Sequence, residues 1–361
     1  MGVPLFDTST PVRGLRDELR AAVERVLDSE RYILGPEVSA FEQEFAAYCG
    51  AGHAVGVANG TEAITIALRA MGVGPGDEVI VPSFTFYASA EAIPPTGATP
   101  VFCDIDPDTY CVTPETVRAA LTPRTKAVIA VHLFGNVAPI AEIEALGVPV
   151  LEDAAQAAGS TVGEQRPGAL GTAATFSFFP SKNLGCFGDG GMITTSDEEI
   201  AERVRVLRFH GSRDKVDYER IGYNSRLDEL QAAILRVQLP HLDAWADGRR
   251  RTGRHYEEAG LGELVALPKP TAGAAPAWHL YVVGDPNVER LEGALEAAGI
   301  GCKPYYRTPV HRQAPMREWS AGVELPATEH AARTHLAIPM SPVLTREQAD
   351  QVVAAARAAR V

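Results

Sequence analysis

The sequence predicts an α/β fold in which a mostly parallel seven-stranded sheet forms a large domain and a smaller α+β C-terminal domain follows. Apolar runs rich in Val and Ile, such as 77–83 and 126–134, alternate with segments of helical periodicity. Such runs are typical of parallel strands that helices cover on both faces. The 361 residues suffice for two domains, and a segment rich in Pro, Ala and Gly, 267–276, precedes a second, shorter set of elements.

The N-terminal part is predicted to be helical over 12–50, where apolar residues recur at helical spacing. Short apolar runs predict the strands of the sheet at 53–59, 77–83, 99–104, 126–134, 148–152, 174–179 and 191–195. Helical patterns at 62–71, 114–121 and 139–145, and a partly helical stretch at 89–96, separate these strands. Sheets of this kind bind ligands at the carboxyl ends of their strands.

The rest of the chain is predicted to be mainly helical. Helices are expected at 197–208, 228–239 and 241–259, with a polar loop at 213–223. The smaller domain is expected to contain strands at 279–283 and 301–306 and helices at 288–298, 326–335 and 345–359. We place the domain boundary near 245, so that 1–245 is the large domain with the N-terminal helical segment and 246–361 is the small C-terminal domain.

Composition and charge limit the classes of partner. The net charge of -13 disfavours nucleic-acid binding. No stretch has the length and apolar character of a membrane span, and the N-terminus lacks the pattern of a secretory signal. The five cysteines are an odd number without metal-type spacing, and the histidines do not cluster with other metal ligands. We therefore expect a cytoplasmic protein with no membrane, nucleic-acid or metal partner.

Lys182 has an unusual sequence environment. It is the only lysine between 161 and 195, and aromatic residues and glycines surround it in FSFFPSKNLGCFGDGGM (176–192). A charged side chain is costly to hold in such surroundings unless it is paired or loses its proton. A neutral lysine is a nucleophile, most often for a Schiff base with an aldehyde cofactor. The alternative is a surface lysine on a glycine turn.

Polar residues at the strand ends are candidates for binding such a cofactor. Gly60 and Thr61 stand between a strand and a helix, where free N–H groups and the helix dipole attract phosphate. The alternative is that Thr61 only caps its helix. Asp153 ends an apolar strand, and a carboxylate there can keep a pyridine nitrogen protonated or can cap a helix. Gln156 follows three residues later and can reach the same ligand if the chain turns helical.

Two more candidates flank these strand ends. Ser177 precedes the lysine and offers a hydroxyl group to a phosphate. Phe86 follows a strand end, where its ring can stack on a planar cofactor, although core packing is the default for such a residue. The glycines after Lys182 permit a tight, irregular backbone, and a simple hairpin turn is the alternative.

Taken in order, five segments resemble those of a known enzyme family. These are NGTEA, PSFTFYAS, LEDAAQAAGS, FSFFPSKNLGCFGDGGM and GYNSRLDELQAAIL. They look like the DegT/DnrJ/EryC1/StrS family of nucleotide-sugar aminotransferases, which depend on pyridoxal 5'-phosphate (PLP). The resemblance runs from about residue 10 to about residue 345. It implies the type I fold of aspartate aminotransferase and PLP as the cofactor.

The resemblance assigns a role to each residue that would contact the cofactor ring. Lys182 would carry the cofactor covalently and shuttle a proton between it and the substrate carbon. Asp153 would pair with the pyridine nitrogen, and Gln156 would contact the ring hydroxyl oxygen. Phe86 matches the position whose aromatic ring covers the pyridine face.

The resemblance also implies a phosphate site that two subunits share. Gly60 and Thr61 would hold the phosphate through backbone and hydroxyl groups, with help from Ser177. Asn224 matches an asparagine that reaches the phosphate of the neighbouring subunit. A homodimer with shared active sites is therefore expected.

The resemblance further predicts the reaction. Lys182 favours transamination, because relatives that dehydrate their substrate carry histidine at this position. L-Glutamate is the usual amino donor. The run NSRLDELQ (224–231) looks like members that aminate C3 of a 3-keto-6-deoxy sugar. The alternatives are C4 amination of a 4-keto-6-deoxy nucleotide sugar, amination of another cyclic ketone, and a non-catalytic sensor on the same fold.

Substrate contacts are expected from two further segments. In 305–311, Tyr306 and His311 match the family pattern for the sugar pocket, whereas Tyr305 and Arg307 depart from it. A nucleoside diphosphate needs cationic partners, and the alternative for each basic residue is a solvated surface charge. The candidate cations are Arg213, Lys215, Lys303, Arg307 and Arg312.

Overall fold

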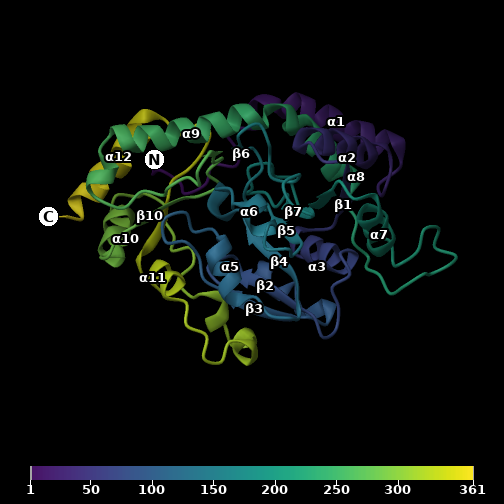
Figure 1. The fold of residues 1–361 in the computed structure, drawn as a ribbon. Coiled ribbons are helices and arrows are strands. Elements are labelled where there is room, and N and C mark those ends of the chain that lie inside the picture. Colours follow the sequence, from purple (N-terminus) through teal and green to yellow (C-terminus); the bar gives the residue numbers. More distant parts are fainter. Residues whose placement is uncertain (1, 361) are drawn as a thin grey trace.

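A seven-stranded sheet forms the centre of the computed structural model, which describes residues 2–360 (Figure 1). Its strands lie in the order β1-β8-β7-β5-β4-β2-β3. Their bounds are β1 (His53–Val57), β2 (Glu78–Pro82), β3 (Thr99–Cys103), β4 (Thr125–Val131), β5 (Val150–Asp153), β7 (Ala173–Ser177) and β8 (Gly191–Thr195). β8 is antiparallel to both of its neighbours, and the other pairs are parallel. The predicted mostly parallel seven-stranded sheet is confirmed.

Helices cover both faces of this sheet. Their bounds are α1 (Arg16–Ser29), α2 (Pro36–Cys49), α3 (Gly60–Ala70), α4 (Ala88–Glu91), α5 (Pro114–Ala120), α6 (Ile140–Glu144), α7 (Glu198–Arg208), α8 (Glu229–Gln238) and α9 (Leu242–Glu258). Val79 and Val81 of β2 belong to the apolar cluster of α3 and α7. Ile80, between them, packs on the opposite face with Val117 of α5 and Ile143 of α6. This alternation is the period of two that places successive strand residues on opposite faces.

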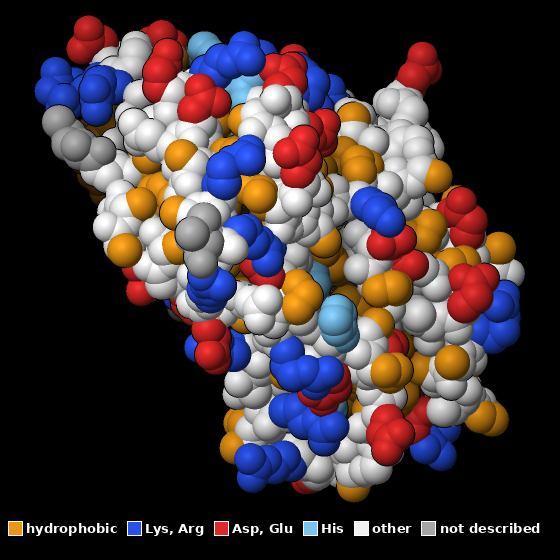
Figure 2. Space-filling view, turned by 90° about the vertical axis from the view of Figure 1, so that its left-hand side faces the viewer, with side chains coloured by type: hydrophobic (Ala, Val, Ile, Leu, Met, Phe, Trp, Pro, Cys, Tyr) orange, Lys and Arg blue, Asp and Glu red, His pale blue; other side chains and the backbone are white. Residues whose placement is uncertain are grey.

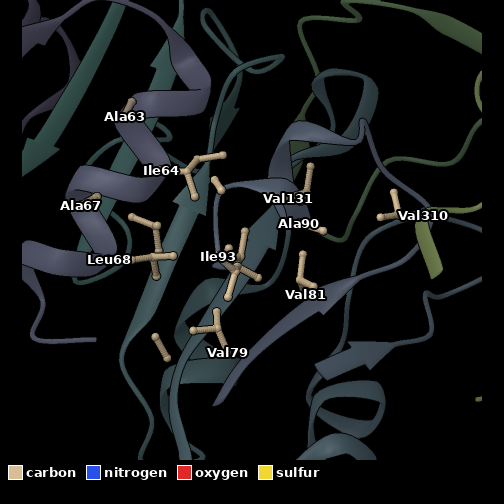
Figure 3. Close-up of a cluster of buried hydrophobic side chains, with 14 of the residues drawn as sticks. Ala63, Ile64, Ala67, Leu68, Val79, Val81, Ala90, Ile93, Val131 and Val310 are labelled. Atoms are coloured by element: carbon tan, nitrogen blue, oxygen red, sulfur yellow. The ribbon is translucent and has the colours of Figure 1, made fainter. Parts of the chain in front are cut away.

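The packing of α3 fixes the position of its N-terminus. Ile64 and Leu68 are buried and point from the helix towards Val79 of β2 and Ile93 (Figure 3). β1, which precedes α3, runs in the same direction as β7, because β8 is antiparallel to both. The carboxyl ends of β1, β2, β5 and β7 therefore meet at one edge of the sheet, and the first residues of α3 lie there.

The C-terminal unit is built on two antiparallel strands, β10 (Tyr281–Gly284) and β11 (His335–Ile338). α10 (Val288–Ala297) and α12 (Arg346–Ala358) pack on them in one apolar cluster, and α11 (Pro326–Thr334) leads into β11. α9 runs from the helices above the sheet to this unit (Figure 1). A further short pairing joins β6 (Thr161–Val162) to β9 (Ala274–Ala275).

Two elements of this unit differ from the sequence prediction. Residues 301–306 do not form the predicted strand: Lys303 makes an isolated bridge to Ala337, and Pro304, which has no N–H to donate, follows it. β11 is absent from the predicted elements, because its four residues directly follow α11 and look like the end of that helix.

The domain boundary near 245 stays a prediction, and it falls in the first turn of α9. Val3 packs in the apolar cluster of the C-terminal unit and bridges Ile300, so the start of the chain lies beside that unit (Figure 1). The face of the molecule over this unit mixes acidic and basic side chains (Figure 2). Over residues 2–360, every helix is too short or too polar to cross a membrane.

Candidate functional site

A cavity of about 610 Å³ lies at the carboxyl edge of the sheet. Its walls come from the turn into α3, from the residues after β2 and β5, from the end of β7 and from the loop that follows β7. The walls include these predicted site residues: Gly60, Thr61, Phe86, Asp153, Gln156, Ser177, Lys182 and Tyr306. The structure thus gathers in one space the residues that separate sequence motifs indicated.

The N-terminus of α3 faces this cavity. Asn59, rather than Thr61, caps the helix, because its Oδ1 accepts a hydrogen bond from the N–H of Glu62 at 2.8 Å. Gly60 and Thr61 come before this donor, and their N–H groups have no partner within the helix. A Cβ atom at 60 would lie 2.8 Å from the Cβ of Ser177, so only glycine lets the helix start approach β7 this closely. The hydroxyl of Thr61 stays free of the capping role.

Asp153 presents a buried carboxylate at the end of β5. One carboxylate oxygen accepts a hydrogen bond from Ser89 Oγ at 2.7 Å, and Ser89 Oγ lies 3.0 Å from Thr85 Oγ1. The other oxygen accepts from the N–H of Ala155 at 3.2 Å. These donors are neutral, so they orient the carboxylate without cancelling its charge. The arrangement suits a protonated ring nitrogen as the partner.

Gln156 and the aromatic residues form the opposite part of the wall. Gln156 Oε1 accepts from the N–H of Phe134 at 2.7 Å, and its Nε2 donates to the hydroxyl oxygen of Tyr306 at 3.1 Å. Burial raises the pKa of Tyr306, so its hydroxyl keeps its proton and can still donate. The ring of Phe86 is 54% exposed and lies 6.3 Å from that of Tyr306, which leaves it free to cover a planar ligand.

Lys182 stands on a tight loop between β7 and β8. The loop is closed by hydrogen bonds from the N–H of Phe178 to the Gly190 oxygen and from the N–H of Lys182 to the Phe179 oxygen, each 2.8 Å long. Enclosure of the partly buried side chain lowers the pKa of Lys182 to about 8, and the negative charge of Asp153 opposes this shift. The sequence-based expectation of a lysine that readily loses its proton agrees with this direction.

Three predicted residues lie outside the cavity, on the segment 209–226. Asn224 is exposed, and its Oδ1 accepts a hydrogen bond from the guanidinium of Arg226. Arg213 forms ion pairs with two glutamates, and Lys215 lies over the ring of Phe209. Between α7 and α8 this segment projects from the body of the molecule (Figure 1).

Of the other predicted substrate residues, Tyr306 lines the cavity and the rest lie outside it. Arg307 pairs with Glu292 at 2.8 Å, beside a separate cavity near α10. His311 is 1% exposed, with Nδ1 at 2.6 Å from Ser83 Oγ and Nε2 at 3.2 Å from Glu329. The expectation of a substrate contact is therefore corrected for His311, because the protein itself encloses its ring. Two other candidate cations stay outside the cavity as well: Lys303 and Arg312.

Two residues of the site were not predicted from the sequence: Ser89, which hydrogen-bonds Asp153, and His279, which lines the cavity. Ser89 belongs to the same PSFTFYAS motif as Phe86, so its place after a strand end was the available signal. His279 lines the cavity, is buried, and has no partner for its Nδ1. Burial, and then the positive charges of Lys182 and Arg249, hold the pKa of His279 well below its usual range. No periodicity or motif marks His279 in the sequence.

A sequence profile of the DegT/DnrJ/EryC1/StrS aminotransferase family matches residues 14–357. The chain belongs to this family. A dTDP-3-amino-3,4,6-trideoxy-α-D-glucose transaminase of Streptomyces venezuelae is 47% identical over 363 residues, which are 98% of this chain and 95% of the relative. A UDP-N-acetyl-3-dehydro-α-D-glucosamine 3-aminotransferase of Acidithiobacillus ferrooxidans is 44% identical over 98% of this chain and 97% of the relative. A pleiotropic regulatory protein of Geobacillus stearothermophilus is 46% identical over 98% of this chain and 97% of the relative.

A solved structure gives the same result for the fold. The crystal structure of Streptomyces venezuelae DesV, in complex with a ketimine intermediate, superposes with a TM-score of 0.94 at 45% identity and covers 99% of this chain and 98% of DesV. The predicted fold of PLP-dependent aminotransferases is confirmed. The chain is thus an aminotransferase of this family, and its cofactor is PLP.

The donors in the cavity wall fit this cofactor. The glycine at 60 lets the start of α3 reach Ser177, which makes a cradle of N–H and hydroxyl groups suited to a phosphate. The buried carboxylate of Asp153 suits a protonated pyridine nitrogen, and a lysine with a lowered pKa suits an aldehyde carbon.

Proposed function

We propose that the protein transfers an amino group to C3 of a 3-keto-6-deoxy sugar carried on a nucleoside diphosphate, with L-glutamate as the amino donor. Two observations together support this most strongly. The candidate cofactor-binding residues surround one cavity. The chain is also 47% and 44% identical to two relatives whose names place the amino group at C3. C4 amination is disfavoured by the same comparison. The names of these two relatives contain different nucleotides, dTDP and UDP, so the assay below tests which nucleotide the substrate of this protein carries.

In this proposal the strand-end residues hold the cofactor. The N–H groups of Gly60 and Thr61 and the hydroxyl groups of Thr61 and Ser177 bind its phosphate. Asp153 pairs with the ring nitrogen and keeps it protonated, and Gln156 contacts the ring hydroxyl oxygen. When bound, PLP draws electrons from the substrate carbon and so makes a hydrogen on that carbon acidic.

Lys182 has two tasks in this proposal. It would hold the cofactor covalently in the resting protein. Its Nζ would then move a proton from the α-carbon of the amino donor to the cofactor, and in the second half-reaction from the cofactor to the sugar carbon. A pKa of about 8 keeps part of the Nζ population neutral near physiological pH, as a general base requires. Phe86, Tyr305 and Tyr306 enclose this space with apolar surface, which excludes water from the proton transfer.

We also propose that the active protein is a homodimer. Asn224 is exposed and does not line the cavity of its own protomer, so it is available to the phosphate in the cavity of the partner. Arg213 and Lys215, on the same projecting segment, would bring positive charge to the diphosphate of the nucleotide sugar, while Tyr306 contacts the sugar from within the cavity. The free thiols of the five cysteines support a cytoplasmic location.

A regulatory protein on the same fold is the second candidate, since one relative is named as a pleiotropic regulatory protein. A sensor does not need a lysine with a lowered pKa beside a buried carboxylate, and this chain has both. Turnover with a keto sugar would reject the purely regulatory function.

The test uses the purified protein, PLP, L-glutamate and a panel of 3-keto and 4-keto sugars linked to dTDP or UDP. We expect amination of a 3-keto substrate, with the new amine on C3 of the product by NMR. An amine on C4 would refute the proposed position. A protein that stays colourless with added PLP and converts no sugar would refute the transaminase function as a whole.

A further inference from the structure

A second cavity, of about 280 Å³, adjoins the first one at Lys182. The two cavities share Phe6, Ser181 and Lys182 in their walls. The rest of the smaller wall comes from the N-terminal segment 6–12, from the loop after Lys182, and from α9, which contributes Arg249. Its volume is less than half that of the first cavity, so it suits an amino acid better than a nucleotide sugar.

Arg249 is a buried cation without a counter-ion. Its side chain is 7% exposed, its Nη1 donates to the Trp278 oxygen at 3.1 Å, and its Nε has no partner. The adjacent Arg250 pairs with Asp247, but the ion pairs formed within residues 2–360 do not include Arg249. Burial lowers the pKa of Arg249 to about 10. An anion would compensate such a charge, and the planar guanidinium binds a carboxylate through two parallel hydrogen bonds.

The charges around the smaller cavity favour an anionic ligand. Lys182 and Arg249 are the cations of its wall, and Asp7 is its acidic residue. The carboxylate of Asp7 already accepts hydrogen bonds from the backbone N–H groups of two residues that follow it. His279 lies close enough to both cations for their charges to lower its pKa, so it stays neutral.

We infer that Arg249 binds a carboxylate of the amino-acid donor, in a subsite between α9 and the segment 6–12 that is separate from the space for the nucleotide sugar. This inference rests on the proposed transaminase function. Every amino-acid donor carries a carboxylate next to the amino group that has to reach the position of Lys182, where the two cavities meet. Phe6 stacks on His279 with ring centroids 5.9 Å apart and contributes to the partition between the two spaces.

The substitution Arg249→Met tests the inference, because it removes the charge and the hydrogen-bond fork but keeps an unbranched side chain. The donor half-reaction is measured by spectral conversion of the PLP-loaded protein with L-glutamate. The sugar half-reaction is measured separately on protein loaded with pyridoxamine phosphate. We expect the efficiency with L-glutamate to fall about 50-fold, within the range for lost charge-assisted hydrogen bonds, and the sugar half-reaction to change less than about threefold.

Two further variants serve as controls. Arg251→Met changes an exposed arginine on the same helix and leaves both half-reactions unchanged. Arg249→Lys keeps the positive charge and recovers part of the efficiency with L-glutamate, which a purely structural role would not require. This variant carries the same comparison if Arg249→Met does not fold.

L-Alanine identifies which carboxylate is bound. An equal loss with L-alanine and L-glutamate assigns Arg249 to the α-carboxylate, and a loss confined to L-glutamate assigns it to the side-chain carboxylate. Equal losses in both half-reactions, no loss in either, or a loss confined to the sugar half-reaction would overturn the inference. A wild-type protein that reacts with neither substrate would instead refute the proposed function.

Discussion

The cavity at the strand ends and the projecting segment 209–226 differ in one respect: the candidate residues of the first line a common space, and those of the second do not. Thr61, Asp153 and Tyr306 come from distant parts of the sequence, yet they line one space within a single protomer. Asn224 and Arg213 lie on the projecting segment and are not part of the wall of that space. We infer that one protomer supplies most of the cofactor contacts, and that in the proposed homodimer the projecting segment contributes its residues to the site of the partner.

The largest expected effect concerns the cavity alone. Lys182→Ala should lower the rate of transamination by about 10⁴-fold or more, because it removes both the covalent attachment and the general base. Steady-state assays with saturating PLP measure this loss. Activity within about tenfold of the wild type would contradict the role of Lys182 and show that the cavity does not contain the reacting lysine.

The division between the two regions can be tested with mixed dimers. Asn224→Asp places a carboxylate against the phosphate and should weaken PLP binding about 100-fold. An equal mixture of this variant with Lys182→Ala, unfolded and refolded together, should regain about a quarter of the wild-type activity, because half of the dimers are mixed and each mixed dimer contains one intact site.

The matched control for that experiment mixes Asp153→Asn with Lys182→Ala. Both residues belong to the cavity of one protomer, so mixing restores no intact site and activity stays at the level of the separate variants. Recovery in this control, or no recovery with Asn224→Asp, would show that the division between the two regions is drawn in the wrong place.

The electrostatics of the cavity predict a pH dependence. The rate at which the cofactor-free protein captures PLP should rise with pH through about 8, as Lys182 loses its proton. Asp153→Asn should move this midpoint to lower pH, because the carboxylate of Asp153 raises the pKa of Lys182. Stopped-flow absorbance measures the rate. A midpoint near the ordinary lysine value of 10.5 would contradict the enclosure of this side chain.

The smallest effect on catalysis is expected at His311. His311→Asn should leave the KM for the sugar within about twofold of the wild type and reduce the free energy of unfolding by about 1–3 kcal/mol, since it disturbs a buried hydrogen bond to Ser83. Urea denaturation and sugar kinetics on the same preparation measure the two quantities. A tenfold higher KM with unchanged stability would return His311 to the substrate site.

The sequence was sufficient for most of the sheet and for the cofactor side of the site. Asp153 and Ser177 end apolar strands, and parallel strands bring their carboxyl ends to one edge, so topology alone predicts that they meet. Phe86 follows the end of β2, and Lys182 follows the end of β7, at the same edge. The type of residue and its place after a strand were therefore enough information.

The remaining residues depend on packing that no local pattern records. His279 and Arg249 acquire their surroundings from the way α9, the N-terminal segment and the C-terminal unit pack on the large sheet. His311 matches a family pattern in the sequence. The pattern shows only that a histidine stands there, and it does not show that Ser83 and Glu329 enclose the ring. β11 was missed because only four residues, three of them apolar, follow the helix, and so short a run shows no clear periodicity.

The most direct test of the central claim is to locate the bound cofactor on the chain. The PLP-loaded protein is reduced with borohydride, which makes the bond between a lysine and an aldehyde permanent, and its peptides are mapped by mass spectrometry. We predict the added mass on the peptide that contains Lys182, at about one equivalent per chain, and on no other lysine. An unlabelled Lys182, with the cofactor absent or attached to another lysine, would contradict the account.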